Sequence, residues 1–282
     1  MQLLAHIAYT GARTDGKLSV AMVTVSVVNQ KGGVGKTTTT INLAYALALQ
    51  GLRVLAVDLD PQASLTIYAG LDVQELEGRR KTLYYSLVED EPIEQLITET
   101  EHFDVIPNSI RLSTGEAELV ASPLTGPHLL KGLLAPLRAR YNYILIDCPP
   151  TLTLLTVNAL AAADEVLIPV KTDILSLMGI TLLLDSIEKT RRRANPDLKI
   201  LGILPTMHNA RYTHDQEALE ELHHLGEHGI RVFEPISRST AFDQAPAEFR
   251  STLELDPSNP GAQSYYKLAE AIVGGPVRIH DQ

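Results

Sequence analysis

The chain has 282 residues, and 45% of them are hydrophobic, which is enough to bury one large α/β core. Acidic residues outnumber lysine and arginine by 34 to 24, so the net charge of -10 excludes a generally basic nucleic-acid coat but leaves room for a local basic patch. The single cysteine excludes an intrachain disulfide framework, and no apolar stretch reaches the roughly 18 residues that span a membrane. We therefore expect a soluble, cytoplasmic protein.

The two ends of the chain differ from the part between them. Residues 1–21 lack the apolar run and the cleavage site of a secretory signal, and Met22 stands directly before the first β-branched run. We interpret residues 1–21 as a flexible extension, with an arm that touches DNA as the alternative. Residues 22–273 contain no internal repeat or low-complexity linker, so we expect one domain there, followed by an unstructured tail at residues 274–282.

Short β-branched runs alternate along the chain with longer segments of helical period. This alternation is typical of repeated βα units, and the runs are nearly all apolar, as in a sheet that is covered on both faces. The predicted fold class is therefore α/β, with a doubly wound, mostly parallel sheet and helices on both faces. The predicted strands are Val23–Asn29, Arg53–Asp58, Phe103–Ile106, Tyr143–Asp147, Glu165–Val170 and Lys199–Leu204. The clearest predicted helices are Thr37–Gln50 and Ser176–Ala194.

The first predicted strand runs into the sequence QKGGVGKTT at residues 30–38, and a helix begins at once. Glycines let the backbone turn with its N–H groups pointing inward, and the helix N-terminus adds positive potential, so this context favours a phosphate-binding loop. Lys36 is placed to reach the β- and γ-phosphates of a nucleotide, and the Thr37 hydroxyl is placed to bind Mg²⁺. The general pattern would have glycine at position 30, where this chain has Gln30.

Carboxylates stand at the ends of two apolar strands. Asp147 ends one of them, where it can hold Mg²⁺ through water beside the phosphates, although a plain turn residue is the alternative. Asp58 and Asp60 lie at the end of the other strand. Because side chains alternate along an extended segment, only one of these two carboxylates need face the nucleotide.

Metal or redox chemistry based on cysteine or histidine finds no support in the spacing of these residues. Cys148 alone cannot form a tetrahedral site, and we expect it to be a small buried residue. The nine histidines show no clear ligand spacing. His223 and His224, for example, are adjacent on a predicted helix and point in different directions.

Three motifs carry a resemblance to a known family. Residues 31–38, KGGVGKTT, resemble the deviant Walker A motif of the ParA/MinD family of P-loop ATPases, whose extra lysine distinguishes it from ordinary P-loops. DLDPQ at residues 58–62 and ILIDCPP at residues 144–150 follow in the family's order. The similarity extends from about Val23 to about Val273, and it implies an ATPase domain at residues 22–273 that binds ATP and Mg²⁺.

The resemblance also assigns catalytic roles. Lys31 would reach across a homodimer into the partner's phosphates, as an arginine finger does in trans. Such a finger is worth roughly 10³ to 10⁵ in rate, or about 4 to 7 kcal/mol, which would make hydrolysis depend on dimerisation. Asp60 would orient the attacking water, with Asp58 in a structural role, and Lys36 would neutralise phosphate charge. The alternatives are that Lys31 is a solvated loop residue and that Asp60 only caps a turn.

The segment at residues 202–211, GILPTMHNAR, resembles the part of the family fold that packs beside the adenine and leads into a DNA-contacting arginine. The resemblance therefore assigns Met207 to the nucleotide and Arg211 to DNA. The complete set of predicted nucleotide contacts is Gly32, Gly33, Val34, Gly35, Lys36, Thr37, Thr38 and Met207.

The loop at residues 236–246 resembles a second family loop near the base, but it departs from the pattern at two positions. The family usually has proline where this chain has Ser237, and a second DNA-binding arginine where it has Ala241. Arg238 is the predicted replacement. The basic run at residues 189–193 is another candidate, although cations are also expected there because a helix C-terminus favours them.

These features together predict a ParA-type partitioning ATPase. ATP would close a homodimer, the dimer would bind double-stranded DNA without sequence preference at the nucleoid, and a ParB-like partner would stimulate slow hydrolysis that drives segregation of a DNA cargo. One alternative is a MinD-like membrane-associated positioning ATPase, but the sequence GGPVRIH at residues 274–280 breaks the pattern of an amphipathic anchor, so we expect no membrane contact. The other alternative is an enzyme on the same scaffold that transfers phosphate to a small acceptor.

Overall fold

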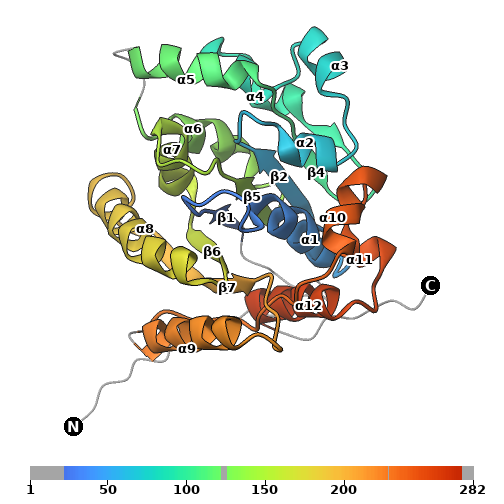
Figure 1. Ribbon diagram of the computed structural model, residues 1–282. Helices are drawn as coiled ribbons and strands as arrows, with labels where there is room; N and C mark the ends of the chain where they lie inside the picture. Colours follow the sequence, from blue (N-terminus) through green and yellow to red (C-terminus); the bar gives the residue numbers. More distant parts are fainter. Residues whose placement is uncertain (1–21, 122–125, 228, 275–282) are drawn as a thin grey trace, which may run out of the picture.

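The computed structural model describes residues 22–121, 126–227 and 229–274 (Figure 1). The predicted extension at residues 1–21, and the predicted tail beyond Gly274, lie outside these described residues. Within the described part of the chain, no helix is both long enough and apolar enough to cross a membrane.

A seven-stranded sheet runs through the centre of the described molecule in the order β3-β4-β2-β5-β1-β6-β7 (Figure 1). All neighbouring strands are parallel except the β3–β4 pair at one edge, which is antiparallel. The strands are β1 (Val23–Val27), β2 (Val54–Asp58), β3 (Thr98–Glu99), β4 (Asp104–Ile106), β5 (Tyr143–Asp147), β6 (Glu165–Lys171) and β7 (Lys199–Thr206). The predicted doubly wound, mostly parallel α/β fold is confirmed.

Helices cover both faces of this sheet. The α-helices are α1 (Lys36–Ala48), α2 (Ser64–Tyr68), α3 (Val73–Gly78), α4 (Leu83–Val88), α5 (Arg111–Ala121), α6 (Leu129–Leu134), α7 (Leu154–Ala162), α8 (Ile174–Arg193), α9 (Thr213–Glu227), α10 (Ala241–Gln244), α11 (Thr252–Leu255) and α12 (Pro260–Val273). Short 3₁₀ helices are η1 (Ile93–Leu96), η2 (Ala135–Leu137) and η3 (Ala245–Glu248). The six predicted strands are all present with small shifts of their ends, whereas the two-residue β3 is too short to leave a sequence signal.

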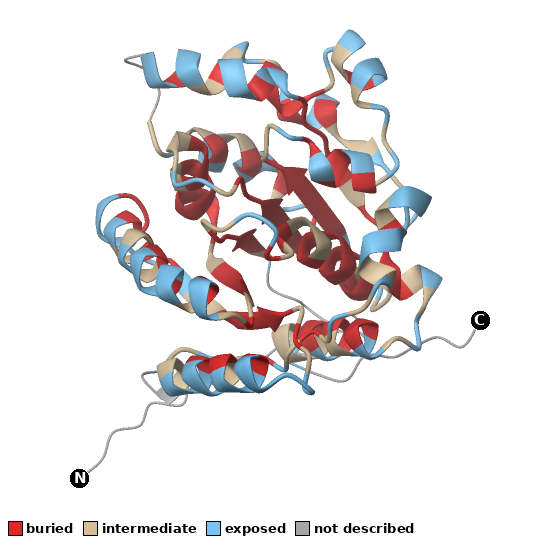
Figure 2. Cartoon of the chain, viewed as in Figure 1, coloured by how far each residue is buried: buried red, intermediate tan, exposed pale blue. Residues whose placement is uncertain are grey.

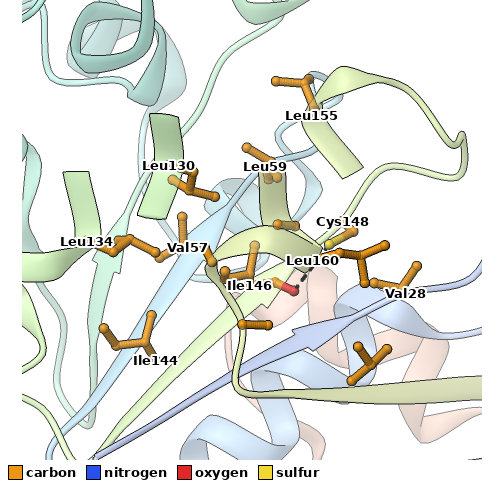
Figure 3. Packing of buried hydrophobic residues seen from close by; sticks show 14 of the residues in the cluster. Val28, Val57, Leu59, Leu130, Leu134, Ile144, Ile146, Cys148, Leu155 and Leu160 are labelled. Carbon is orange, nitrogen blue, oxygen red and sulfur yellow. Dashed lines mark hydrogen bonds between the residues drawn. The ribbon is translucent and has the colours of Figure 1, made fainter. Parts of the chain in front are cut away.

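Successive side chains of each strand point to opposite faces of the sheet, so the core has two layers. In β5, Ile144 and Ile146 join a cluster with α4 to α9, whereas Tyr143 and Leu145 join a second cluster with α1, α2, α11 and α12. Figure 3 shows part of the first cluster, where β2 and β5 pack against leucines of α6 and α7. The buried thiol of Cys148 lies in this cluster, as expected for a small core residue (Figure 3). The centre of the molecule is accordingly buried, whereas the outer helix faces are exposed (Figure 2).

The strand order determines which strand ends meet. Strand β5 lies between β1 and β2, so Asp147 is in register with Val27 on one side and with Asp58 on the other. The chain segments that follow these three residues therefore leave the same edge of the sheet next to one another. This edge, where α1 covers one face and α7 the other, is where ligands bind in open α/β sheets.

Candidate active site

The loop between β1 and α1 has the backbone of an anion-binding cradle. Gly33 and Gly35 have φ angles of 69° and 85°, in the left-handed region that glycine adopts without strain. A β-carbon added at Gly32 or Gly33 would meet no atom within 4 Å, so the side of the loop that these residues present is open. The helix α1 begins at Lys36 directly after this turn, and its first N–H groups point to the same space.

A cavity of about 480 Å³ opens over this loop. It is lined by Gly32, Gly33, Gly35, Lys36, Thr37, Thr38, Asp60, Ser64, Ile67, Tyr68, Pro150, Met207 and Pro246. All the predicted nucleotide contacts line the cavity except Val34. The Val34 side chain is buried and its carbonyl accepts a hydrogen bond from the Thr206 hydroxyl at 2.9 Å, so a ligand could reach Val34 only through its backbone N–H.

Lys36 is the buried cation of the site. Its side chain leaves the first turn of α1, and its ammonium group donates to the Lys31 carbonyl at 3.4 Å. Burial lowers the pKa of Lys36 from its ordinary value, although the carboxylates of Asp147 and Asp60 oppose the shift. An ammonium group with so little solvent interacts strongly with any anion that enters the cavity.

Asp147 and Thr37 meet beside Lys36. The Thr37 hydroxyl donates to Asp147 Oδ2 at 2.6 Å, whereas the buried Oδ1 has no hydrogen-bond partner among the described residues. Burial raises the pKa of Asp147 to about 7, despite the opposing effects of Thr37 and Lys36. A buried carboxylate oxygen without a partner is costly unless a cation or an ordered water takes it. Oxygen donors from a hydroxyl and a carboxylate are those that Mg²⁺ prefers, so these residues fit the predicted metal.

Asp58 and Asp60 point in different directions, as the alternation of an extended segment requires. Asp58 is fully buried, where Oδ2 accepts hydrogen bonds from the Thr66 backbone N–H at 2.8 Å and from the Thr66 hydroxyl at 2.6 Å. Burial, together with the nearby Asp147, raises the pKa of Asp58 to about 8. Asp60 instead lines the cavity and accepts from the Gln62 backbone N–H at 3.0 Å. Asp58 therefore connects β2 to α2, and Asp60 is the carboxylate that a ligand can reach.

Lys31, the extra lysine of the loop, does not line the cavity. Its ammonium group lies 2.9 Å from Asp173 Oδ1 and 2.9 Å from the Ser176 hydroxyl, at the start of α8 in the same chain. Lys171 also lies 3.2 Å from Asp173 Oδ2. Partial burial disfavours the charge of Asp173, but hydrogen bonds from Lys31, Ser176 and Lys171 outweigh it and hold the pKa of that carboxyl well below its usual range. The ammonium group of Lys31 is thus directed away from the phosphate loop.

The sequence did not indicate some of the residues around the cavity. Ser64, Ile67 and Tyr68 reach it from α2, and the only signal for them was their place directly after the DLDPQ motif. Asp173 left no signal at all, because its contact with Lys31 joins residues far apart in the chain.

Met207 connects the main cavity to a smaller one. Its backbone is left-handed, with a φ of 54°, and its side chain also lines a neighbouring cavity of about 110 Å³. The backbone N–H of Arg238 donates to the His208 carbonyl at 2.9 Å, which holds the two predicted nucleobase segments side by side. The smaller cavity is lined by Gly35, Thr38, Thr206, Met207, Ile236, Ser237, Arg238, Ser239, Phe242, Asp243 and Tyr265.

The predicted DNA-binding residues are on the surface. Arg211 and Arg238 are both exposed, but Arg238 also lines the smaller cavity beside Met207. In the basic run at the end of α8, Arg191 and Arg192 each form an ion pair with Glu188, at 2.6 and 2.9 Å. Their charges are thereby partly neutralised, which makes this run a poorer anion-binding surface than its sequence indicates.

Comparison with known proteins agrees with this site. A family model described as an AAA domain matches residues 22–200. The chain is 38% identical over 275 residues to the chromosome partitioning protein ParA of Myxococcus xanthus, covering 95% of each chain. It is also 38% identical over 251 residues to the sporulation initiation inhibitor protein Soj of Bacillus subtilis, covering 88% of this chain and 97% of that protein.

One solved structure with the same fold contains a bound nucleotide analogue. Cobyrinic acid a,c-diamide synthase from Mycobacterium smegmatis, with bound ATP analogue and magnesium, superposes with a TM-score of 0.77 at 33% identity, covering 90% of this chain and 95% of that chain. The fold and the phosphate loop thus define a P-loop nucleoside-triphosphatase domain. Given the extent of the match to the partitioning proteins, the chain belongs to the ParA/MinD family of P-loop ATPases.

Proposed function

We propose that this protein is a ParA-type partitioning ATPase that hydrolyses ATP to ADP and phosphate and uses the cycle to segregate a DNA cargo. The observation that carries the proposal is the single cavity that brings together Lys36, Thr37 and Asp60 over the phosphate loop, with Asp147 next to Thr37. The names of the relatives ParA and Soj support the partitioning role.

Each of these side chains has a part in the proposed reaction. The loop N–H groups and the Lys36 ammonium group hold the triphosphate, and Asp60 orients the water that attacks the γ-phosphorus as the bond to ADP breaks. Thr37 and Asp147 would hold Mg²⁺, which neutralises phosphate charge when it is bound. Asp58 connects β2 to α2 through its hydrogen bonds with Thr66. This connection restrains the segment between β2 and α2, which carries Asp60.

Hydrolysis is proposed to require two subunits. In a single chain Lys31 is paired with Asp173, and a partly exposed ion pair of this kind is worth only about 0.2 to 1 kcal/mol. In the transition state of hydrolysis, contact with a partner's triphosphate would be worth far more, up to the roughly 4 to 7 kcal/mol by which a finger acting in trans lowers the activation barrier. Lys31 can therefore leave Asp173 for the partner's phosphates at little cost once the dimer closes.

An exposed apolar surface next to Lys31 supports dimerisation. Ile174, Leu175, Met178 and Leu182 of α8 are each more than 60% exposed, and the first of them follows directly after Asp173. Figure 2 shows the outer side of α8 as mostly exposed. Apolar side chains gathered on one exposed helix face indicate an interface, and here that interface would include the Lys31 loop.

The proposed dimer binds double-stranded DNA through Arg211, with Arg238 as a second candidate, and a ParB-like protein stimulates hydrolysis. Two subunits would present two such patches to one duplex, which strengthens otherwise weak nonspecific binding. Through this DNA binding, the protein would act at the nucleoid in the cytoplasm. The similarity to a diamide synthase supports one alternative, an enzyme on the same fold that transfers phosphate to a small acceptor.

The proposed function is tested by ATP-dependent DNA binding and by steady-state hydrolysis. Asp60→Ala should keep nucleotide-dependent DNA binding while hydrolysis is lost, because Asp60 serves the water and not the nucleotide. Asp197→Ala, at an exposed loop residue before β7, is the matched control and should behave as the wild type. If the wild type ignores DNA at low salt, and instead turns ATP over rapidly without DNA or partner, the partitioning role is wrong and the small-acceptor enzyme is favoured.

A further inference from the structure

A cluster of three side chains with metal-ligating groups lies on the α1 face of the sheet, apart from the nucleotide cavity. It consists of Glu101 and His102, in the loop between β3 and β4, and Glu254 of α11. One donor atom from each of the three residues lies within 4.8 Å of the others. The His102 ring packs against Tyr45, which is nine residues after Lys36, or roughly 14 Å further along α1. The cluster is thus distinct from the predicted Mg²⁺ site.

The histidine is held in place and one of its nitrogens has no partner. The His102 ring meets the Tyr45 ring edge-on, with centroids 4.7 Å apart and an angle of 75° between the planes. Its Nε2 atom is buried and forms no hydrogen bond with any described residue, and it lies 3.9 Å from Glu254 Oε1. An imidazole nitrogen that is shielded from solvent, fixed in direction and directed at carboxylates is suited to a metal ion.

The carboxylate of Glu254 is also positioned by its neighbours. Arg250 donates to Glu254 Oε1 through Nε at 2.7 Å, and its Nη2 lies 2.6 Å from the same oxygen. Ligating carboxylates are commonly oriented by such hydrogen bonds. Because the Arg250 side chain is half exposed, it can turn toward solvent if its positive charge repels the bound metal ion. Glu101 is exposed and can move to complete the set.

A cavity adjoins the cluster and leaves room for a further ligand. Its volume is about 230 Å³, and its walls include Thr100, Glu101, His102, Phe249 and Glu254. A metal ion held by three protein groups keeps an open coordination position for water. This cavity can supply that water.

We propose that Glu101, His102 and Glu254 form a binding site for a divalent transition metal, with Zn²⁺ as the ion that suits it best. One imidazole and two carboxylates are borderline donors that suit Zn²⁺, whereas Mg²⁺ and Ca²⁺ prefer oxygen ligands alone. The bound ion joins the β3–β4 loop to α11.

A metal ion at this site would restrain a segment that reaches the nucleotide cavity. Glu254 lies eight residues after Pro246, which lines the nucleotide cavity, and the segment between them turns at Phe249 with a left-handed φ of 53°. Phe249 packs closely on Gly70, where an added β-carbon would come within 3.2 Å of it. An ion that fixes α11 to the β3–β4 loop therefore restrains the segment that carries Pro246.

The test uses the full chain without a polyhistidine tag, stripped of metal with a chelator and free of nucleotide. Co²⁺ is titrated while its visible d–d absorption is recorded, and Zn²⁺ is titrated by calorimetry. The wild type should bind one equivalent of each ion, with d–d bands that indicate nitrogen and oxygen ligands. His102→Gln and Glu101→Gln should each weaken binding by roughly 10-fold or more.

Two control variants test whether the metal binds elsewhere. His223→Gln removes an exposed histidine of α9 and should leave the titration unchanged. Asp147→Asn removes a ligand of the predicted Mg²⁺ site and should also leave it unchanged, unless the added ion binds at that site. Glu101→Gln alters an exposed side chain, so it remains informative if His102→Gln fails to fold. Zn²⁺ should also raise the melting temperature of the wild type by more than that of Glu101→Gln. The proposal is overturned if the wild type takes up no Zn²⁺ in this titration, or if Glu101→Gln binds it as the wild type does.

Discussion

The nucleotide cavity and the surface around Lys31 differ in how far a single chain completes them. In the cavity and directly beneath it, Lys36, Asp147 and Asp58 are buried, and each has a hydrogen-bond partner in the same chain. At the surface, Lys31 is only paired with Asp173 and the apolar side chains of α8 are exposed. In the proposed function, one chain would suffice to bind a nucleotide, whereas a second chain would complete the parts that make hydrolysis fast.

The largest expected effect separates these two regions directly. Lys31→Ala should abolish the acceleration of hydrolysis by partner and DNA, a loss of roughly 10³- to 10⁵-fold, because the charge supplied in trans is removed. Nucleotide affinity of the monomer should change little, since Lys31 does not line the cavity. Lys171→Ala, which also removes a cation beside Asp173, is the matched control. Equal losses in both variants would mean that the Asp173 contact matters, and not delivery to a partner.

A smaller effect tests how the cavity is built. The pKa values of Asp58 and Asp147 in the folded chain, about 8 and about 7, lie above the ordinary 3.8, so the folded chain holds more protons than the unfolded chain between these limits. The free energy of unfolding of the nucleotide-free protein should therefore fall as the pH rises through this window. In Asp147→Asn, the decrease in the free energy of unfolding across this pH window should be smaller by an amount on the order of a few kcal/mol. Denaturant titrations at pH values across the window measure this difference.

The control for this pH experiment is Asp197→Asn, because Asp197 is exposed and lies in the loop before β7. It should retain the pH dependence of the wild type. Added Mg²⁺ and ATP should stabilise the wild type most at high pH, since the metal requires the ionised carboxylate. A pH dependence that is the same in Asp147→Asn as in the wild type would contradict this assignment of the proton.

The smallest effect concerns the surface arginines. Arg211→Ala should leave dimerisation intact and weaken DNA binding, and it should lower the slope of log affinity against log salt by about one for each arginine lost. Arg79→Ala, at an exposed arginine that follows α3, is the control.

Arg238→Ala should be measured for nucleotide affinity as well as for DNA binding, because Arg238 lines the cavity beside Met207. If only nucleotide affinity falls, Arg238 serves the base and not DNA.

Much of the fold was predictable because its strands are apolar and its helices are amphipathic. The P-loop was predictable for a different reason: its chemistry is contiguous, so one run of residues from Gly32 to Thr38 carries it. The sequence offered the basic run at the end of α8 as a candidate for DNA binding, but it did not show that Glu188 pairs with Arg191 and Arg192, although these residues are close in sequence. Helical spacing permits such pairs, but only the structure shows which of them form.

The α/β class, the phosphate loop and the carboxylates at the strand ends could be predicted from the sequence alone, because each depends on residues that are neighbours in the chain. The position of β5 between β1 and β2, which brings Asp147 to Thr37, is known only from the folded chain. The same holds for the contacts of Lys31 with Asp173 and of His102 with Glu254. These contacts join distant segments, and which distant segments meet depends on how helices and strands bury their apolar faces together, which no local pattern records.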